Sequence, residues 1–338
     1  MTLRFPMLAN SSITSTIPYD QPGVLHGHLH PPHSRDDSAY GAIMIPISVI
    51  NNGQGPTVLL TGGNHGDEYY GPLALTRFLA TVDPATIIGR VIVVPYMNYP
   101  AFSAGARTSP IDAGNLNRVF PGSPTGTVTQ RIADYMTRYL LPMADAVLDI
   151  HDGGRTLEFM PMASTHVLDN KADEARNRQA AAAFGAPFVT CLVELDQLGM
   201  WDCTVEESGT GFVTTELGGG GTTRPELMRI ANQGVVNVLR HWGAMTGTVA
   251  PAASAVLHIP DDNAYVISAG EGLIEWLVNL GDPIAAGQPI AQVYSTVHLG
   301  NAPEEILATM DGVLAMRHYP GTVKMGDAIA MQATLTPA

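Results

Sequence analysis

Four short apolar segments, each rich in β-branched residues and each followed by polar groups, constrain the fold of this 338-residue chain more than any other feature. They span residues 57–61, 91–95, 146–150 and 211–215. Stretches with a helical period lie between them, at 70–82, 128–140 and 172–184. Strands that are apolar along their whole length are typical of a sheet covered on both faces. The alternation therefore predicts an α/β fold, with helices packed on a sheet.

The two ends of the chain follow other patterns. Residues 1–50 are expected to form a loop and then a strand over 43–50. After about residue 250, short β-like stretches and turns replace the helical periods, and the stretch 281–287 is loosely repeated at 321–327. We therefore expect three parts: an N-terminal extension over 1–40, an α/β domain over 41–248 and a small all-β domain over 249–338.

Composition argues against several classes of function. The formal net charge is −14 at pH 7, and no basic patch could neutralise phosphates, so we expect no nucleic-acid partner. No apolar run reaches the roughly 18 residues of a membrane-spanning helix, so we expect no membrane insertion. The only cysteines, Cys191 and Cys203, cannot make a disulfide framework, which favours a location in the reducing cytoplasm.

Polar residues directly follow three of the four apolar segments. The stretch 62–68 follows the first, 151–154 follows the third and 216–221 follows the fourth. In open α/β sheets, ligands bind beyond the carboxyl ends of the strands. We therefore expect the side chains of these three stretches to lie close together.

His65, Glu68 and His151 have the chemistry of a catalytic zinc site. Such a site takes three protein ligands from His, Asp or Glu and leaves one position open. His65 and Glu68 are spaced H-x-x-E at the expected strand-to-helix turn, and His151 ends another expected strand. An isolated H-x-x-E could be a chance match on a helix surface. The shared position at strand ends favours a site for one Zn²⁺ per chain instead.

Glu216 is the candidate general base. Hydrolysis at a zinc site requires a carboxylate that does not bind the metal, takes a proton from water and passes it to the leaving amine. Glu216 follows the fourth apolar segment and is expected at the same edge of the sheet. The sequence contains no G-x-S-x-G motif, which removes the most familiar route of the serine hydrolases.

A second polar stretch follows the segment 91–95 and contains Arg107, Asn117 and Arg118. The planar guanidinium of arginine suits a carboxylate ligand, and Asn117 would add amide donors to the same anion. Arg107 could instead polarise a carbonyl under attack and stabilise its oxyanion. Both arginines could also simply pair with surface acids, as arginines in acidic proteins usually do.

Four motifs, in this order along the chain, resemble those of the succinylglutamate desuccinylase/aspartoacylase family, which is related to the zinc carboxypeptidases. They are Gly63-Asn64-His65-Gly66-Asp67-Glu68, Asn115-Leu116-Asn117-Arg118, Asp149-Ile150-His151 and Glu216-Leu217-Gly218. The resemblance covers roughly residues 40–335. It implies a zinc carboxypeptidase-like mixed sheet flanked by helices, followed by a small β domain.

The resemblance also implies an enzyme, a zinc-dependent hydrolase that cleaves the linear amide of a small N-acyl amino acid. By this resemblance, the zinc ligands are His65, Glu68 and His151, and the general base is Glu216. The resemblance assigns the substrate carboxylate to Asn117 and Arg118, and it places Arg107 beside the scissile carbonyl.

The N-terminal stretches 23–29 and 34–39 resemble one subgroup of that family, the N-α-acetyl-L-2,4-diaminobutyrate deacetylases of ectoine breakdown. This implies diaminobutyrate and acetate as products. Aspartoacylase, succinylglutamate desuccinylase and carboxypeptidase activities are alternatives within the same chemistry. A non-catalytic binding protein built on this scaffold is an alternative from another class.

Two further features have no place in this chemistry. The first is a dense histidine stretch, for which we expect a loop with a solvated or interface role, a second metal site being the alternative: His26, His28, His30 and His33. The second is a likeness of the C-terminal repeat to biotinyl/lipoyl carrier domains, with Ala315-Met316-Arg317 where a carrier has its modified lysine. Because arginine cannot form that amide, we expect a lid or an oligomer contact there, and a homo-oligomer.

Overall fold

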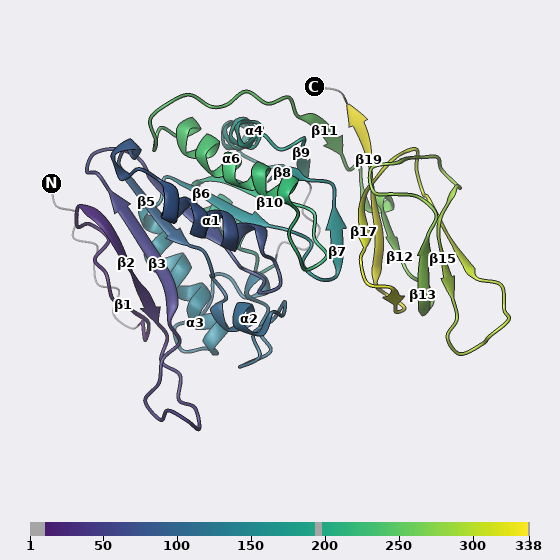
Figure 1. Ribbon diagram of the computed structural model, residues 1–338, viewed down its shortest axis with the longest axis horizontal. Coiled ribbons are helices and arrows are strands. Elements are labelled where there is room, and N and C mark those ends of the chain that lie inside the picture. The colour runs from purple at the N-terminus through teal and green to yellow at the C-terminus, as the bar shows by residue number, and fades with distance from the viewer. Residues whose placement is uncertain (1–10, 193–197, 337–338) are drawn as a thin grey trace.

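The structure is a computed structural model, which describes residues 11–192 and 198–336 (Figure 1). Its helices are α1 (Tyr70–Thr81), α2 (Tyr99–Ala104), α3 (Val128–Tyr135), α4 (Lys171–Phe184), α5 (Trp201–Glu207) and α6 (Pro225–His241). Its strands up to residue 216 are β1 (Thr14–Ser15), β2 (Gly23–His30), β3 (Ile45–Asn51), β4 (Thr57–Gly62), β5 (Arg90–Val94), β6 (Ala146–His151), β7 (Leu157–Phe159), β8 (Met162–His166), β9 (Phe188–Leu192) and β10 (Gly211–Glu216). The later strands are β11 (Ala255–His258), β12 (Tyr265–Ile267), β13 (Gly272–Trp276), β14 (Pro283–Ile284), β15 (Pro289–Tyr294), β16 (Glu304–Leu307), β17 (Gly312–His318), β18 (Thr322–Val323) and β19 (Ala328–Thr336).

The predicted α/β alternation is confirmed. The four apolar segments are β4, β5, β6 and β10, each within one residue of its predicted ends. The helical periods at 70–82 and 172–184 correspond to α1 and α4. The third period, at 128–140, begins as α3 and then widens into a π-helical turn over Met136–Leu140. The mixed sheet and its helices therefore follow from the periodicity of the sequence.

The central strands are buried on both faces because helices cover both sides of the sheet. In β4, Val58 and Leu60 belong to the core under α1, α4 and α6, whereas Leu59 between them belongs to the core under α3 and α5. This alternation follows from the two-residue period of a strand. Figure 1 shows α1, α4 and α6 together over one face of the sheet. No helix in the described ranges is long and apolar enough to cross a membrane.

The order of the strands brings the polar stretches together. The main sheet runs β1-β2-β3-β5-β4-β6-β10-β8-β9-β11-β19-β17-β14, and its central strands β5, β4, β6 and β10 are parallel. Gly62 of β4 lies beside Ile150 of β6, and Glu216 of β10 lies beside His151. The carboxyl ends of β4, β6 and β10 are thus neighbours at one edge of the sheet, as expected.

The expectation of a loop at the histidine stretch is wrong for His26, His28 and His30. These residues lie in β2, which pairs with β3 along its length. They alternate with Leu25, Gly27 and Leu29, and Leu29 is 1% exposed, so the stretch has the two-residue period of a strand with one face on the core. His26 Nδ1 is 2.8 Å from Ser48 Oγ of β3.

The region after residue 250 consists of strands β11–β19 and one 3₁₀ turn, Asp262–Ala264. Its strand β11 pairs with β9 on one side and with β19 on the other. Strand β7 is attached to the same region through β17. The backbone ladder of the main sheet therefore continues across residue 249. A second sheet, β16-β15-β13-β18, lies at the far end of this region (Figure 1).

Replacing Gly66 by alanine should destabilise the loop between β4 and α1. A Cβ at this position would lie 2.0 Å from the carbonyl carbon of Ala101 and 2.2 Å from the backbone nitrogen of Phe102, both in α2. Because helix backbone cannot rotate aside, we expect Gly66→Ala to lower the free energy of unfolding by about 1–3 kcal/mol in urea titrations. Gly321→Ala is the matched control, since a Cβ there meets no atom within 4 Å. Equal stability of the two variants would contradict this account.

Candidate metal centre and active site

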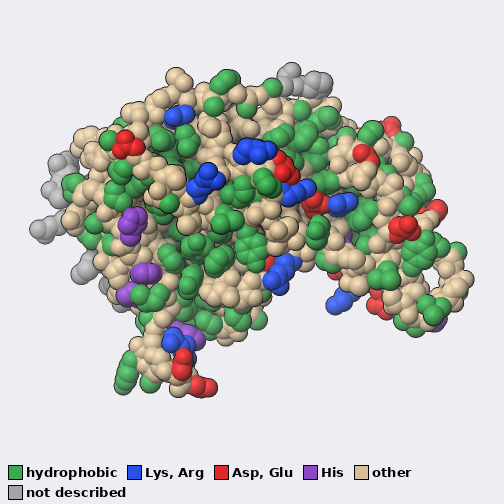
Figure 2. All heavy atoms as spheres, in the orientation of Figure 1, with side chains coloured by type: hydrophobic (Ala, Val, Ile, Leu, Met, Phe, Trp, Pro, Cys, Tyr) green, Lys and Arg blue, Asp and Glu red, His purple; other side chains and the backbone are tan. Residues whose placement is uncertain are grey.

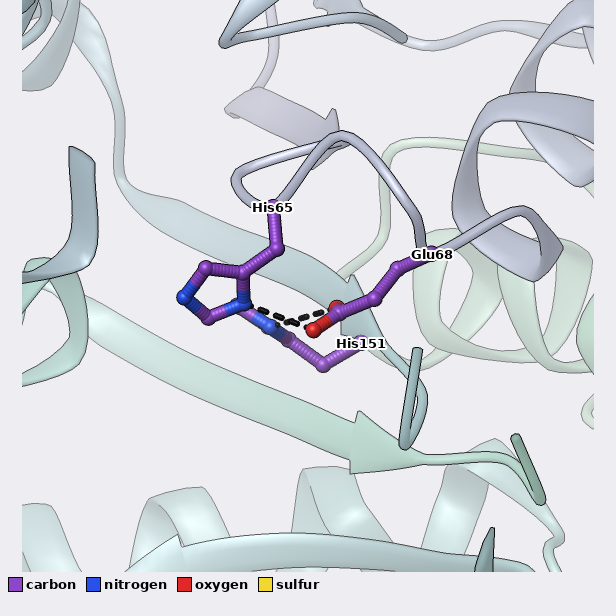
Figure 3. A group of neighbouring side chains, drawn as sticks. All are labelled: His65, Glu68 and His151. Carbon is purple, nitrogen blue, oxygen red and sulfur yellow. Dashed lines mark hydrogen bonds and ion pairs between the residues drawn. The ribbon is translucent and has the colours of Figure 1, made fainter. Parts of the chain in front are cut away.

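His65, Glu68 and His151 converge at the shared edge of the sheet (Figure 3). One potential ligand atom from each lies within 4.8 Å of the other two, and all three residues are buried. His65 Nδ1 is 2.6 Å from Glu68 Oε1, and His151 Nδ1 is 2.9 Å from Glu68 Oε2. Within residues 11–192 and 198–336, no other group of three or more His, Cys, Asp or Glu side chains converges in this way.

Asp152 holds the loop that carries Glu68. This carboxylate follows His151 and accepts hydrogen bonds from the backbone N–H groups of Tyr69, at 2.8 Å, and Tyr70, at 3.1 Å. These two residues begin α1, whose first N–H groups have no partner within the helix. Asp152, just after β6, thus caps the N-terminus of α1. Because Glu68 directly precedes Tyr69, this contact also holds Glu68 opposite His151.

Asp149 orients the imidazole of His151. The two residues are two positions apart in β6, so their side chains point to the same face of the sheet. Asp149 Oδ2 is 2.8 Å from His151 Nε2, and Asp149 Oδ1 accepts a hydrogen bond of 2.7 Å from Thr61 Oγ1. A proton on Nε2 facing this carboxylate leaves the lone pair of His151 Nδ1 directed at the centre of the group.

The charges of the site act strongly on one another. Burial raises the pKa of Glu68, but the imidazoles of His65 and His151 outweigh it and hold that pKa well below its usual range. Burial lowers the pKa of His65. Burial and then the negative charge of Glu68 raise the pKa of Glu216, and the same two causes raise the pKa of Asp152 to about 8. Burial lowers the pKa of His151, but the carboxylates of Asp149 and Glu68 outweigh it and raise that pKa well above its usual range.

The donor set fits a metal ion. Two imidazole nitrogens and one carboxylate are ligands that zinc accepts, and they leave one of its positions for water or substrate. A divalent cation would also add positive charge beside the buried side chains of Glu68, Asp149 and Asp152. The Nδ1 atoms of His65 and His151 both face the carboxylate of Glu68, at 2.6 Å and 2.9 Å. The His65–Glu68–His151 group could therefore hold a metal ion.

Glu216 lies next to this group without being part of it. It is the register partner of His151 in the parallel pair of β10 and β6, so both side chains leave the sheet on the same face. The residue is half-buried, and its Oε2 atom is shielded from solvent and accepts no hydrogen bond from the described part of the chain. Such a carboxylate is available to a water or a substrate beside the group.

Asn117 is held so that its amide nitrogen can act as a donor. Its Oδ1 accepts a hydrogen bond of 3.1 Å from Asn64 Nδ2 and one of 2.8 Å from the backbone N–H of Trp201. Asn64 Nδ2 also lies 3.4 Å from Asp149 Oδ2. With both lone pairs of the oxygen occupied, the NH₂ of Asn117 faces elsewhere. Asn64 thus connects Asn117 with Asp149, the carboxylate that contacts His151.

The two predicted arginines differ in their distance from the metal group. Arg107 Nη1 lies 3.6 Å from Glu68 Oε1, and its side chain is 41% exposed. Arg107 is therefore at the mouth of the site. Arg118 is exposed, and its Nη1 donates a hydrogen bond of 2.7 Å to the backbone carbonyl of Asn117. The structure thus brings Arg107 into contact with the metal group and Arg118 into contact with Asn117.

Three positioning residues described above are absent from the predictions. Asp149 and Asn64 lie inside the motifs that were recognised, and Asp152 directly follows one of them. The spacing D-x-H on one strand carries a usable signal for Asp149, because residues two apart share a face. The contacts of Asn64 and Asp152 join segments about 50 and 80 residues apart, and no local pattern encodes them.

A separate cavity of about 420 Å³ lies away from this edge of the sheet. It is lined by His166 at the end of β8 and by acidic residues that include Asp169 and Glu206. Strand β8 is antiparallel to β10, so its carboxyl end lies at the opposite edge from Glu216. We place the candidate active site at His65, Glu68 and His151, because only there do ligand atoms converge in the described residues.

Comparison with known proteins gives one consistent family. Residues 54–242 match the family model of the succinylglutamate desuccinylase/aspartoacylase catalytic domain. The chain is 50% identical over 325 residues to the N-alpha-acetyl-L-2,4-diaminobutyric acid deacetylase of Halomonas elongata, which covers 96% of this chain and 95% of that protein.

Solved structures agree with this match along nearly the whole chain. A succinylglutamate desuccinylase from Silicibacter sp. superposes with a TM-score of 0.94 at 51% identity, covering 97% of this chain and 99% of the other. The product-bound ectoine utilisation protein EutE (DoeB) from Ruegeria pomeroyi superposes with a TM-score of 0.93 at 51% identity, covering 95% and 98%. The family predicted from the motifs is thereby confirmed: the chain belongs to the succinylglutamate desuccinylase/aspartoacylase family.

Proposed function

We propose that this protein is a zinc-dependent amidohydrolase that converts N-α-acetyl-L-2,4-diaminobutyrate into diaminobutyrate and acetate. The observation that carries the reaction type is the buried convergence of His65, Glu68 and His151 beside the Oε2 atom of Glu216, which has no hydrogen-bond partner among the described residues. The choice of substrate is supported by the 50% identity, over nearly the whole chain, to a deacetylase of that name. We also propose that the fold is of the zinc carboxypeptidase-like type.

In this proposal His65, Glu68 and His151 hold one Zn²⁺. A zinc ion there supplies Lewis acidity and lowers the pKa of water toward neutrality. Glu216 accepts a proton from the water that attacks the acyl carbonyl and then donates it to the amine nitrogen as the C–N bond breaks. Arg107, beside Glu68, donates hydrogen bonds to the carbonyl oxygen as it becomes negative.

Asn117 and Arg118 bind the substrate carboxylate. The oxygen of the Asn117 amide accepts hydrogen bonds from Asn64 and from the backbone of Trp201, and its NH₂ faces away from these two donors. The exposed Arg118 is the next residue along the chain. A charge-assisted hydrogen bond to such an anion contributes about 1.5–3 kcal/mol. Docked in this way, the acyl group points toward Arg107 and the metal group.

Other activities would use the same machinery. Aspartoacylase, desuccinylase and carboxypeptidase reactions differ in the acyl group or in the room for a peptide. The Silicibacter structure, at 51% identity, bears the name of a desuccinylase, and this favours the desuccinylase reaction as the second candidate. A non-catalytic binding protein is disfavoured by the unpartnered Glu216 oxygen, which has no structural role among the described residues.

The remaining predictions about the protein as a whole are also proposals. We propose a division at about residues 40 and 248 into an extension, a catalytic domain and a small β domain resembling biotinyl/lipoyl barrels without the modified lysine. We propose a homo-oligomer in the cytoplasm. Neither Cys191 nor Cys203 forms a disulfide, which is compatible with that compartment.

Substrate comparison with a general-base variant tests the function. We expect one zinc per chain and acetate release from N-α-acetyl-2,4-diaminobutyrate faster than deacylation of N-acetylaspartate or N-succinylglutamate. Glu216→Gln should keep the zinc but lose at least about 100-fold in kcat, the contribution of general acid–base catalysis. Preference for N-succinylglutamate would replace the substrate, and full activity of Glu216→Gln would remove that residue from the mechanism.

Arg118→Ala should weaken substrate binding more than catalysis. Loss of a charge-assisted contact to the carboxylate is expected to raise KM about 10- to 100-fold with little change in kcat. Arg178→Ala, on the exposed side of α4, is a matched control that should leave both constants unchanged. An unchanged KM in Arg118→Ala would argue against carboxylate docking at this residue.

Asp149→Asn should weaken metal binding without removing a ligand. The amide cannot carry the negative charge that faces His151 Nε2, so we expect zinc affinity to fall about 10- to 100-fold in chelator competition. Asp83→Asn, at an exposed turn, serves as the control. If both variants bind zinc like the unchanged protein, Asp149 does not tune the site.

A further inference from the structure

The segment that follows Glu216 is a glycine loop, residues 217–221, whose shape is unusual. Its four consecutive glycines, 218 to 221, all have positive φ, between 63° and 146°. Residues with a Cβ rarely adopt a positive φ, so the path of the backbone requires glycine at these positions. Leu217 is buried in the core, but the four glycines after it have no side chain with which to pack. Their path, directly beyond the strand end that carries Glu216, therefore depends on what contacts them from outside.

Strand β7 makes these outside contacts through its backbone. The carbonyl of Gly218 accepts hydrogen bonds from the N–H groups of Phe159, at 3.0 Å, and Gly153, at 3.1 Å. The N–H of Gly220 donates to the carbonyl of Leu157, at 3.2 Å. Between Leu157 and Phe159, Glu158 forms an isolated antiparallel bridge with Gly219. Residues 157–159 are thus the lateral support of the glycine loop.

The other edge of β7 pairs with the C-terminal region. Glu158 is the register partner of Arg317 in β17, and Tyr319 donates from its N–H to the carbonyl of Thr156 at 2.9 Å. The ring of Tyr319 lies directly on Gly220, where a Cβ would be within 2.6–3.0 Å of three ring carbons. The glycine loop is therefore enclosed between β7 and a turn of the C-terminal region.

An ion cluster closes this arrangement at Glu158, whose side chain is 8% exposed. Glu158 Oε2 accepts hydrogen bonds from Arg317 Nε, at 2.9 Å, and Nη2, at 2.6 Å, while Oε1 is 3.0 Å from Arg224 Nη2. The guanidinium of Arg224 lies 2.9 Å from the place of a Cβ at Gly218. Figure 2 shows basic and acidic side chains gathered over the junction between α6 and the C-terminal strands.

We infer that Glu158 is a positioning residue: together with Arg224 and Arg317 it fixes the glycine loop between β7 and the C-terminal strand β17, and so sets the position of Glu216. Glu158 touches neither the metal group nor, in the proposed docking, the substrate. Arg317 lies where a carrier domain would have its modified lysine, and here its guanidinium binds Glu158 and joins β17 to β7. The inference rests on the proposed function in assigning the general base to Glu216.

The test uses the full-length, zinc-loaded protein with Glu158→Gln. We expect kcat to fall roughly 10- to 100-fold with KM nearly unchanged, because a displacement of about 1 Å in a catalytic group can cost about 100-fold. Hydrogen–deuterium exchange should become faster in the peptide that covers 217–224 but not in the one that covers 61–69. Zinc content should stay at one per chain. Glu174→Gln is the matched control, because Glu174 also binds two cations, Lys171 and Arg178, but on α4.

Arg317→Gln is the second variant, in case Glu158→Gln does not fold. We expect the same local change in exchange and a smaller loss of kcat, and Arg317→Lys, which keeps the charge, should restore part of it. Unchanged exchange at 217–224 with kcat within about twofold of the wild type would overturn the inference. Faster exchange in both peptides with loss of zinc would also overturn it, since Glu158 would then support the fold in general. If the wild type hydrolyses none of the substrates, the proposed function fails, while the exchange data still decide whether Glu158 holds the loop.

Discussion

A carboxylate buried between two imidazoles is the interaction on which the rest of this site depends. Glu68 is 2% exposed and contacts both His65 and His151. Burial and then the charge of Glu68 raise the pKa values of Glu216 and Asp152, so several acidic groups are crowded together at this point. A buried charge is costly unless it is paired. The most direct physical relief is a divalent cation among the three ligand atoms, which also fits the proposed hydrolytic chemistry.

The fold holds this unfavourable collection of charges by surrounding it with directed hydrogen bonds. Asp152 caps α1, Asp149 fixes one imidazole, and Asn64 extends from Asp149 to Asn117. These contacts lie within β6 and between its end and the loops beside it, at one edge of the parallel sheet. Rigid placement of this kind is what allows a site to be ready before the substrate arrives.

The sequence was informative where chemistry and chain order coincide. The apolar segments predicted the central strands, and the edge rule for parallel sheets then predicted that His65, His151 and Glu216 would meet. The prediction of a loop at the histidine stretch is wrong because it rests on the number of histidines. Their two-residue spacing, which is typical of a strand, is the better guide. The partnership of Glu158 and Arg317 could not be predicted, since 159 residues separate them and each alone resembles an ordinary surface charge.

The pairing of β9 with β11 and of β7 with β17 also has an evolutionary consequence. Because strands from before and after residue 249 pair with one another and the glycine loop contacts both halves, the C-terminal strands are poor candidates for exchange as a module. A substitution that reshapes β17 is felt by the loop after Glu216, and a substitution in that loop must still fit against Tyr319. Changes at this contact would therefore have to be matched in the two halves, even though the proposed chemistry uses residues of only one.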